Sequence, residues 1–149
     1  MMNFLNTAAN TEQDKMKGVF LSAKLPQLNR MNAERRCIAK RYLTVLHYLD
    51  LILTTVPDYA QPVWHILALC CSRRDELEKH LNSFCIMTNK HYLTPMDFQK
   101  CYWNHDYKQD DYPLAEEISQ TELSMPMFYV MTKDEIQFVI NSINDFRSK

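Results

Sequence analysis

The sequence predicts an α+β fold in which a small, mainly antiparallel sheet of a few strands packs against amphipathic helices. The chain has 149 residues, 46% of them hydrophobic, which is enough for one hydrophobic core. Segments with the apolar spacing of helices are mixed with short apolar runs typical of strands. These segments do not follow the strict strand–helix–strand rhythm of a parallel sheet, so a mixed α+β domain is expected.

The N-terminal third is predicted to be helical. We expect residues 1–12 to form a flexible tail and residues 13–149 to form a single domain. A short amphipathic helix follows the tail and is interrupted by Pro26. Its apolar positions, spaced by three or four residues, are Met16, Val19, Phe20 and Ala23. A longer helix over 27–49 has the apolar stripe Ile38, Tyr42, Val45 and Leu49.

The middle of the chain is predicted to contain the sheet. Residues 51–62 begin like a strand, and the apolar run from Val63 to Cys71 is typical of a buried one. Ser72 then has the character of a helix N-cap, with Asp75 favourably placed in the first turn. The apolar face of that helix comprises Leu77, Leu81 and Phe84. Residues 85–92 are interpreted as a return strand that ends in a His-Tyr pair.

The C-terminal third alternates helices with polar loops. Short helices are predicted over 94–102, with Pro95 in a tolerated first-turn position, and from 114 to about 123. The last helix is the best marked, because Thr132 and Glu135 have the spacing of a capping box. Its apolar face comprises Ile136, Val139, Ile140, Ile143 and Phe146.

Composition excludes several classes of protein. A net charge of −1 argues against general nucleic-acid binding, and no apolar run approaches the roughly 20 residues that cross a membrane. The first residues lack the pattern of a signal peptide, and an odd number of cysteines, five, indicates reduced thiols in a cytoplasmic protein. Gly18 is the only glycine, which excludes the glycine-rich phosphate-binding loops.

Charge is unevenly distributed along the chain. Residues 14–41 contain eight basic and two acidic side chains, whereas residues 106–122 contain one basic and six acidic ones. Two solvated faces would explain this pattern. The alternative is a basic surface that attracts a phosphate-bearing ligand or an acidic partner.

Three segments in the same order resemble one enzyme family. They are residues 20–43, residues 62–81 followed by Lys90–His91–Tyr92, and residues 116–146. Together they resemble the C-terminal small domain of the DegT/DnrJ/EryC1/StrS aminotransferases, which are pyridoxal-phosphate enzymes that aminate keto sugars carried on nucleotides. The resemblance implies a small domain like that of fold-type I aminotransferases. It also implies that the helix over 27–49 is the helix between the two domains.

The resemblance also implies that the active site is incomplete. In such an enzyme a larger, preceding domain supplies the lysine of the internal aldimine and the aspartate that faces the pyridine nitrogen. No segment here resembles that domain, so no catalytic residue is assigned and the chain alone is not expected to bind pyridoxal phosphate. After the His-Tyr pair the sequence departs from the family, with Leu93 and Asp97 where a proline and a histidine are usual.

The site residues that the resemblance implies are Lys90, His91 and Tyr92, as a vestigial edge of the sugar-binding site. Arg35 and Arg36 could attract a phosphate, although a solvated helix face is the alternative. No metal site is predicted, because among the cysteines and histidines only Cys101 and His105 have a spacing near that of zinc ligands. No cysteine nucleophile is assigned, and His47 and His65 are interpreted as structural histidines.

Three functions remain open: a remnant without chemistry of its own, one half of a split aminotransferase that works with a separately encoded cofactor domain, or a non-enzymatic interaction module. The parent activity implied by the resemblance belongs to nucleotide-sugar and surface-polysaccharide biosynthesis. A small domain without its large partner should expose an apolar patch. We expect it along Val19, Phe20 and residues 125–131, and we therefore expect a homodimer or another protein partner.

Overall fold

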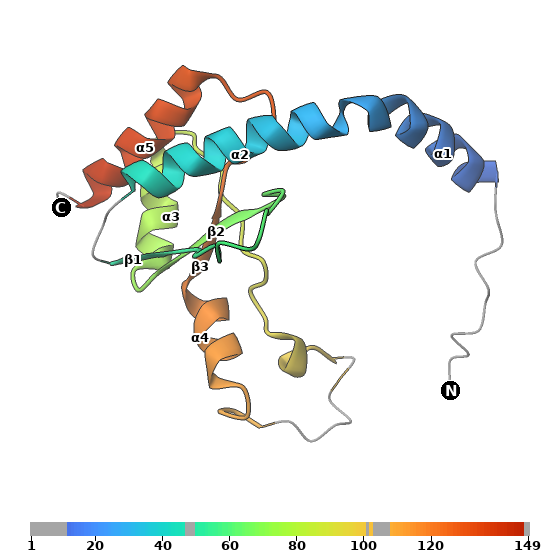
Figure 1. Cartoon of the computed structure of the whole chain (residues 1–149). Coiled ribbons are helices and arrows are strands. Elements are labelled where there is room, and N and C mark those ends of the chain that lie inside the picture. The colour runs from blue at the N-terminus through green and yellow to red at the C-terminus, as the bar shows by residue number, and fades with distance from the viewer. Residues whose placement is uncertain (1–11, 47–49, 101, 103–107, 148–149) are drawn as a thin grey trace.

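A three-stranded antiparallel sheet lies at the centre of the computed structural model, which describes residues 12–46, 50–100, 102 and 108–147 (Figure 1). The strands are β1 (Leu51–Leu53), β2 (Leu67–Cys71) and β3 (Glu122–Met125), in the order β1-β2-β3. In the register of the sheet, Leu69 of β2 pairs with Leu53 on one side and with Leu123 on the other. The predicted α+β class and the mainly antiparallel sheet are therefore confirmed.

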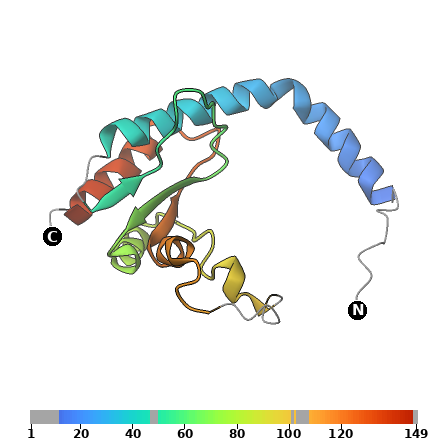
Figure 2. The same ribbon diagram turned by 60° about the horizontal axis from the view of Figure 1, so that its bottom comes forward.

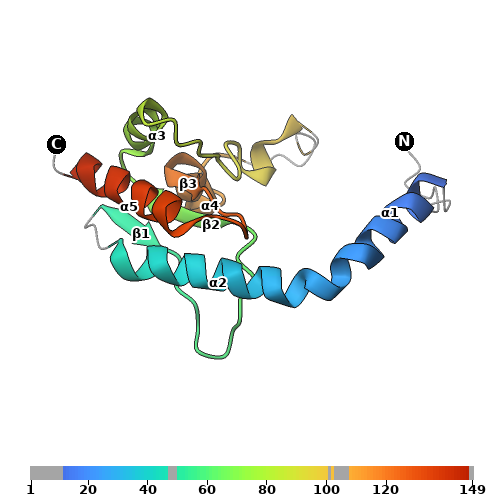
Figure 3. The same ribbon diagram turned by 90° about the horizontal axis from the view of Figure 1, so that it is seen from above.

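Five α-helices and two short 3-10 turns account for the other regular elements of the described residues. They are α1 (Glu12–Lys24), η1 (Leu25–Gln27), α2 (Leu28–Val45), α3 (Arg74–Ser83), η2 (Met96–Phe98), α4 (Pro113–Thr121) and α5 (Lys133–Arg147). Helices α2 and α5 lie side by side, and α3 packs against α5 (Figures 1 and 3). Helix α4 extends from the sheet on the side away from α2 (Figure 1).

The hydrophobic core lies between the sheet and the helices α2, α3 and α5. Strand β2 alternates in burial, with Leu67, Leu69 and Cys71 buried. Fully enclosed side chains from the surrounding elements pack with them, among them Tyr42, Leu77, Leu81, Leu123 and Ile140. Burial of each such leucine or isoleucine contributes about 1.5–3 kcal/mol, so these contacts hold the helices on the sheet.

Helix α5 confirms the clearest prediction. The Thr132 backbone N–H and hydroxyl donate to Glu135 Oε2 at 2.7 and 2.8 Å, and Thr132 Oγ1 accepts from the Glu135 N–H at 3.2 Å. This reciprocal bonding satisfies amides that have no partner within the helix. All five residues of the predicted apolar face are buried.

Helix α2 is shorter than the predicted range of 27–49. It begins at Leu28 and ends at Val45, and Leu46 has left the helical conformation with φ −82° and ψ 89°. Ile38 and Tyr42 of the predicted stripe are buried and Val45 is half-buried, whereas Leu49 and His47 lie outside the described residues.

Pro26 interrupts the α-helix as the sequence predicted, because α1 ends at Lys24 and α2 begins at Leu28. It lies in the first positions of the turn η1, where its missing N–H leaves no bond unmade, and the chain passes from α1 through η1 into α2 (Figure 1). The predicted flexible tail, residues 1–12, lies outside the described residues except for Glu12, which opens α1. Helix α1 is longer than expected and projects away from the sheet (Figure 2).

The central segment differs from the prediction in two respects, although its buried strand is present as β2. The predicted strand 63–71 is regular only from Leu67, because Trp64 has φ 52°, outside the extended region. Ser72 is not the N-cap of α3, since Arg73 occupies that position without a side-chain capping bond. The acidic first turn is as predicted, with Asp75 and Glu76, and Leu77 and Leu81 are fully buried while Phe84 is 39% exposed.

The predicted return strand 85–92 is also not a strand. It contributes a single antiparallel bridge, in which Asn89 and Ser124 exchange backbone bonds of 3.2 and 2.7 Å. The strand that pairs with β2 is instead β3, which the sequence analysis missed by extending the preceding helix to about residue 123. In place of the predicted helix 94–102, the chain forms the turn η2, with Pro95 at its N-cap, and Lys100 and Tyr102 also have 3-10 conformation.

No helix among the described residues combines the length and the apolar character that crossing a bilayer requires.

Candidate functional site

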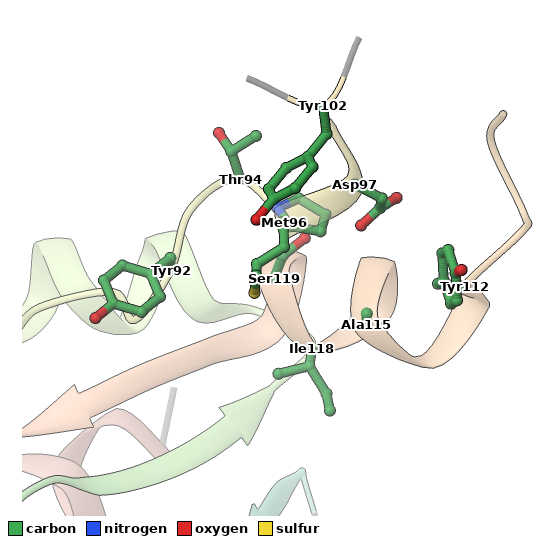
Figure 4. Close-up of a pocket in the computed structure, with 10 residues that line it drawn as sticks. Tyr92, Thr94, Met96, Asp97, Tyr102, Tyr112, Ala115, Ile118 and Ser119 are labelled. Atoms are coloured by element: carbon green, nitrogen blue, oxygen red, sulfur yellow. The ribbon is translucent and has the colours of Figure 1, made fainter. Parts of the chain in front are cut away.

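A cavity of about 520 Å³ lies between the segment 92–98 and helix α4 (Figure 4). Its lining is mostly apolar and aromatic, with Tyr92, Met96, Tyr102, Tyr112 and Ile118 among the contributing residues. Its acidic residue is Asp97, which belongs to the turn η2 and lies on the side of the cavity opposite α4 (Figure 4). A largely apolar pocket with few polar groups is the usual form of a small-molecule site.

The segment that carries the predicted site residues is attached to β3 by a polar network. Glu122 is 97% buried, and its Oε2 accepts the backbone N–H of His91 at 2.7 Å while its Oε1 accepts the hydroxyl of Ser124. His91 Nδ1 lies 2.8 Å from Ser124 Oγ, and its Nε2 lies 3.2 Å from Asn89 Nδ2. Because the Ser124 proton is given to Glu122, the arrangement assigns the ring proton of His91 to Nδ1.

The three residues Lys90, His91 and Tyr92 do not point to one place. The Lys90 ammonium lies 2.7 Å from Glu78 Oε2 and 3.2 Å from Asp75 Oδ1, both on α3. The hydrogen bond with Glu78 raises the pKa of Lys90 above its usual value, against an opposing effect of desolvation. His91 faces the network on β3, and only Tyr92, 70% exposed, lines the cavity.

Arg35 and Arg36 bond to a different part of the molecule. Arg35 donates to the carbonyls of Trp64 and His65, both at 3.3 Å, and Arg36 donates to the carbonyl of Pro62 at 3.3 Å. Arg36 also lines a separate cavity of about 410 Å³ between α2 and the segment 56–64. In this arrangement the two arginines hold α2 against the segment that leads into β2. Neither arginine lines the cavity of Tyr92.

The cysteines and histidines that the structure describes do not converge. In the part of the chain that the structure describes, no group of three or more His, Cys, Asp or Glu side chains is placed to hold a metal ion. Cys101 and His105 lie outside the described residues. His80 packs against Phe84 and Phe146, with Nε2 2.8 Å from the carbonyl oxygen of Ser142, which is a structural role.

The described lysines do not have the environment that an aldimine with pyridoxal phosphate requires. Every described lysine is exposed except Lys90, which is half-buried and paired with two carboxylates. An aldimine lysine needs a desolvated pocket that depresses its pKa, and the two carboxylates have the opposite effect on Lys90.

Glu122 and Ser124, which organise this region, were not predicted from the sequence. They are two positions apart, and this spacing is typical of a strand, since residues i and i+2 of a strand share a face. Two polar residues that alternate with Leu123 and Met125 over 122–125 therefore indicate a strand with one polar face. The assignment of residues 114–123 to a helix concealed it.

Comparison with known proteins gives one consistent result. The sequence model of the "DegT/DnrJ/EryC1/StrS aminotransferase family" matches residues 4–144. The chain is 31% identical over 137 residues to a dTDP-3-amino-3,6-dideoxy-alpha-D-galactopyranose transaminase of Aneurinibacillus thermoaerophilus, covering 92% of this chain and 37% of that protein. It is 30% identical over 142 residues to a dTDP-3-amino-3,4,6-trideoxy-alpha-D-glucose transaminase of Streptomyces venezuelae, covering 94% of this chain and 37% of that protein.

Solved structures agree with the sequence matches. The crystal structure of Streptomyces venezuelae DesV in complex with a ketimine intermediate superimposes with a TM-score of 0.82 at 30% identity, over 87% of this chain and 35% of that one. A DegT DnrJ EryC1 StrS aminotransferase from Brucella abortus superimposes with a TM-score of 0.78 at 24% identity, over 87% of this chain and 34% of that one, which shows the shared fold. The chain thus spans little more than a third of the length of these proteins.

Proposed function

The chain belongs to the DegT/DnrJ/EryC1/StrS aminotransferase family, and from this premise we propose that it is a keto-sugar aminotransferase small domain that is catalytically incomplete alone. The match to 37% of a sugar transaminase and to 35% of a solved member of the family supports a correspondence to the small domain alone. The proposal rests on the extent of one match, which covers 92% of this chain but only 37% of a sugar transaminase.

The cofactor of the family supports the same conclusion. Pyridoxal phosphate supplies the electron sink for transamination, and it needs a lysine, a partner for its pyridine nitrogen and a phosphate cradle. The described residues do not fit it, because their lysines are exposed or, for Lys90, ion-paired. We therefore assign to this chain no step of the reaction, and place the cofactor on a separate large domain.

The part played by this chain is then to close one side of a sugar site. Tyr92 would contact the sugar, His91 would hold the backbone of the segment through its bonds to β3, and Lys90 would fix the segment to α3. Lys90 is thus better suited to positioning than to direct contact with a phosphate. Arg35 and Arg36 would attract the phosphates of a nucleotide only if the bonds to Pro62, Trp64 and His65 were exchanged.

A partner is supported by one specific observation, the exposure of α1. Its apolar side chains, continued through η1 into α2, are Met16, Val19, Phe20, Leu21, Leu25 and Leu28, all at least 45% exposed. A contiguous exposed apolar surface of this kind marks a protein interface. The partial match to the relatives favours a separately encoded large domain as the protein that covers this surface. A second copy of the chain or an unrelated protein would instead correspond to the interaction module.

Cofactor trapping on the purified chain tests incompleteness. We expect incubation with pyridoxal phosphate and borohydride, followed by mass mapping, to label exposed lysines weakly and without preference. Stoichiometric labelling of one lysine, with an absorbance band that an amino donor bleaches, would overturn the proposal.

Complementation tests the role of the chain in a split enzyme. The large domain of the Streptomyces venezuelae transaminase, expressed without its small domain, is assayed alone, with this chain and with the Phe20→Glu variant. We expect activity or a stabilised aldimine band only with the unmodified chain. Equal behaviour of all three mixtures would argue for the remnant or the interaction module.

A further inference from the structure

The cavity of about 410 Å³ between α2 and the segment 56–64 shares no lining residue with the cavity of Tyr92. Its first wall is one face of α2, which contributes Arg36, Lys40 and Leu43. Its second wall is the long loop that joins β1 to β2 beside α2, shown in Figure 3. The two walls therefore come from segments that the proposed sugar site does not use.

The charged residues that line this cavity are both cations. Arg36 and Lys40 are four positions apart on α2 and so share a face of the helix. Arg36 donates Nε to the carbonyl of Pro62 at 3.3 Å, which holds the guanidinium and leaves the edge formed by Nη1 and Nη2 for a ligand. Lys40 is exposed, and Asp58, the acidic residue of the segment, does not line the cavity. The lining therefore attracts a negatively charged group.

The floor of the cavity is apolar. Trp64 is 9% exposed, and Leu43 and Val56 are half-buried against the hydrophobic core. The exposed residues of the lining are all polar: Lys40, Thr44 and Gln61. A ligand that matches this arrangement has an apolar ring at one end and a charged group at the other. The volume is within the range of small-molecule pockets.

We propose that this cavity binds a small aromatic carboxylate. The carboxylate accepts hydrogen bonds from the Nη edge of Arg36 and pairs with the ammonium of Lys40. The ring packs against Trp64 and Leu43. Arg36 keeps its bond to Pro62 in this arrangement, so no backbone contact has to change. This inference concerns the chain by itself and does not depend on the proposed large-domain partner.

Other ligand classes fit less well. A nucleotide diphosphate would need Arg35 and Arg36 to exchange their bonds to backbone carbonyls, whereas a single carboxylate needs only the free edge of Arg36. A cationic ligand would be repelled by Arg36 and Lys40. A small inorganic anion would pair with these charges and leave the apolar floor unused.

The fluorescence of Trp64 provides a direct measurement of binding. In the full chain with Trp103→Phe, Trp64 is the one remaining tryptophan. Phenylacetate is titrated at neutral pH and low salt and compared with phenylacetamide, acetate and inorganic phosphate, with calorimetry as a second readout. We expect phenylacetate to bind at least about tenfold more tightly than each of the other three, because it alone has both the charge and the ring.

Three outcomes of this titration would overturn the proposal. Undetectable binding of phenylacetate would exclude the site. Equal affinity for phenylacetamide would show that the cations do not contribute. Equal affinity for acetate or phosphate would show an adventitious ion only, without use of the apolar floor.

Variants locate the site on the chain. Lys40→Gln should weaken phenylacetate binding about three- to fivefold at low salt, and less at high salt. Lys79→Gln makes the same charge change at an exposed position of α3 and should leave the affinity unchanged. Ala60→Phe fills the cavity from the loop and should weaken binding at least about tenfold. Equal effects of the two lysine substitutions, or full affinity in Ala60→Phe, would contradict the assignment.

Discussion

At the scale of single residues, the hydroxyl of Ser124 connects two groups that are far apart in the sequence. It donates to the buried carboxylate of Glu122 and lies 2.8 Å from His91 Nδ1. Without it, one carboxylate oxygen and one ring nitrogen would lose their partners inside the protein. Leaving a buried polar group without a partner costs more free energy than one hydrogen bond contributes, because the group has already lost its contact with water.

Ser124→Ala is therefore expected to destabilise the chain by about 1–3 kcal/mol in urea-induced unfolding. Ser72→Ala, at an exposed position just before α3, provides the control and should change the free energy of unfolding by less than about 0.5 kcal/mol. Equal effects of the two substitutions would show that the network does not contribute to stability.

Lys90 gives a prediction about pH. Its pKa is raised above the usual value of 10.5, first by the hydrogen bond with Glu78. The ion pairs with Glu78 and Asp75 therefore stabilise the fold fully below the pKa of the unfolded chain. That stabilisation is lost as the pH rises through the higher pKa of the folded chain.

The measurement compares wild type with Lys90→Met by urea unfolding at pH 8 and above pH 11. The variant should be less stable than wild type at pH 8, and the difference should shrink at the higher pH. Lys79→Met, which removes an exposed lysine of α3, should give a smaller difference that does not follow this pattern. A gap between wild type and Lys90→Met that is the same at both pH values would contradict the assignment.

At the scale of secondary-structure elements, α5 depends on its capping box. The bond from the Thr132 backbone N–H lowers the pKa of Glu135, and the Thr132 hydroxyl lowers it further. Glu135 therefore stabilises the helix above its usual pKa of 4.5, and this effect is lost as the pH falls through the lower pKa of the folded chain.

Thr132→Ala removes the hydroxyl that accepts the Glu135 N–H and should cost about 1 kcal/mol of stability at neutral pH. Thr55→Ala, on the exposed segment after β1, is a suitable control. An unchanged midpoint in thermal unfolding of Thr132→Ala would show that the cap contributes nothing measurable.

Elements defined by local interactions were predicted well, and elements defined by distant pairing were not. The capping box of α5 and its five buried apolar residues involve neighbours three or four positions apart, so the sequence contains all of the information. Strand β3 exists because it pairs with β2, about 55 positions earlier. Its first two residues, Glu122 and Leu123, were predicted as the end of a helix for the lack of that partner.

At the scale of the whole molecule, the exposed apolar residues of α1 dominate the expected behaviour. Val19 and Phe20 were correctly predicted to be exposed, at 69% and 64%. The other part of the predicted patch, residues 125–131, is different: Met125 is 4% exposed and Met127 and Met131 are half-buried against the core, which leaves Phe128 and Val130 exposed. The expected interface is therefore on α1.

Phe20→Glu should leave the stability of the monomer within about 0.5 kcal/mol of wild type, because the side chain is 64% exposed. Wild type is expected to self-associate with rising concentration in analytical ultracentrifugation, and the variant should lose at least about tenfold in association constant. A wild-type chain that stays at 17.7 kDa at all concentrations would exclude a homodimer and leave the large domain or another protein as the partner.

The sequence by itself determined the fold class, the α5 cap, the buried faces of α2 and α5 and the family, because each depends on composition, on neighbours along a helix or on the order of motifs. Only the tertiary structure decided where side chains of the candidate site point. Lys90 pairs with α3, Arg35 and Arg36 bond to the carbonyls of Pro62, Trp64 and His65, and the half-buried Asp97 lines the cavity beside α4. These positions depend on contacts between segments that lie tens of residues apart, and no local spacing encodes them.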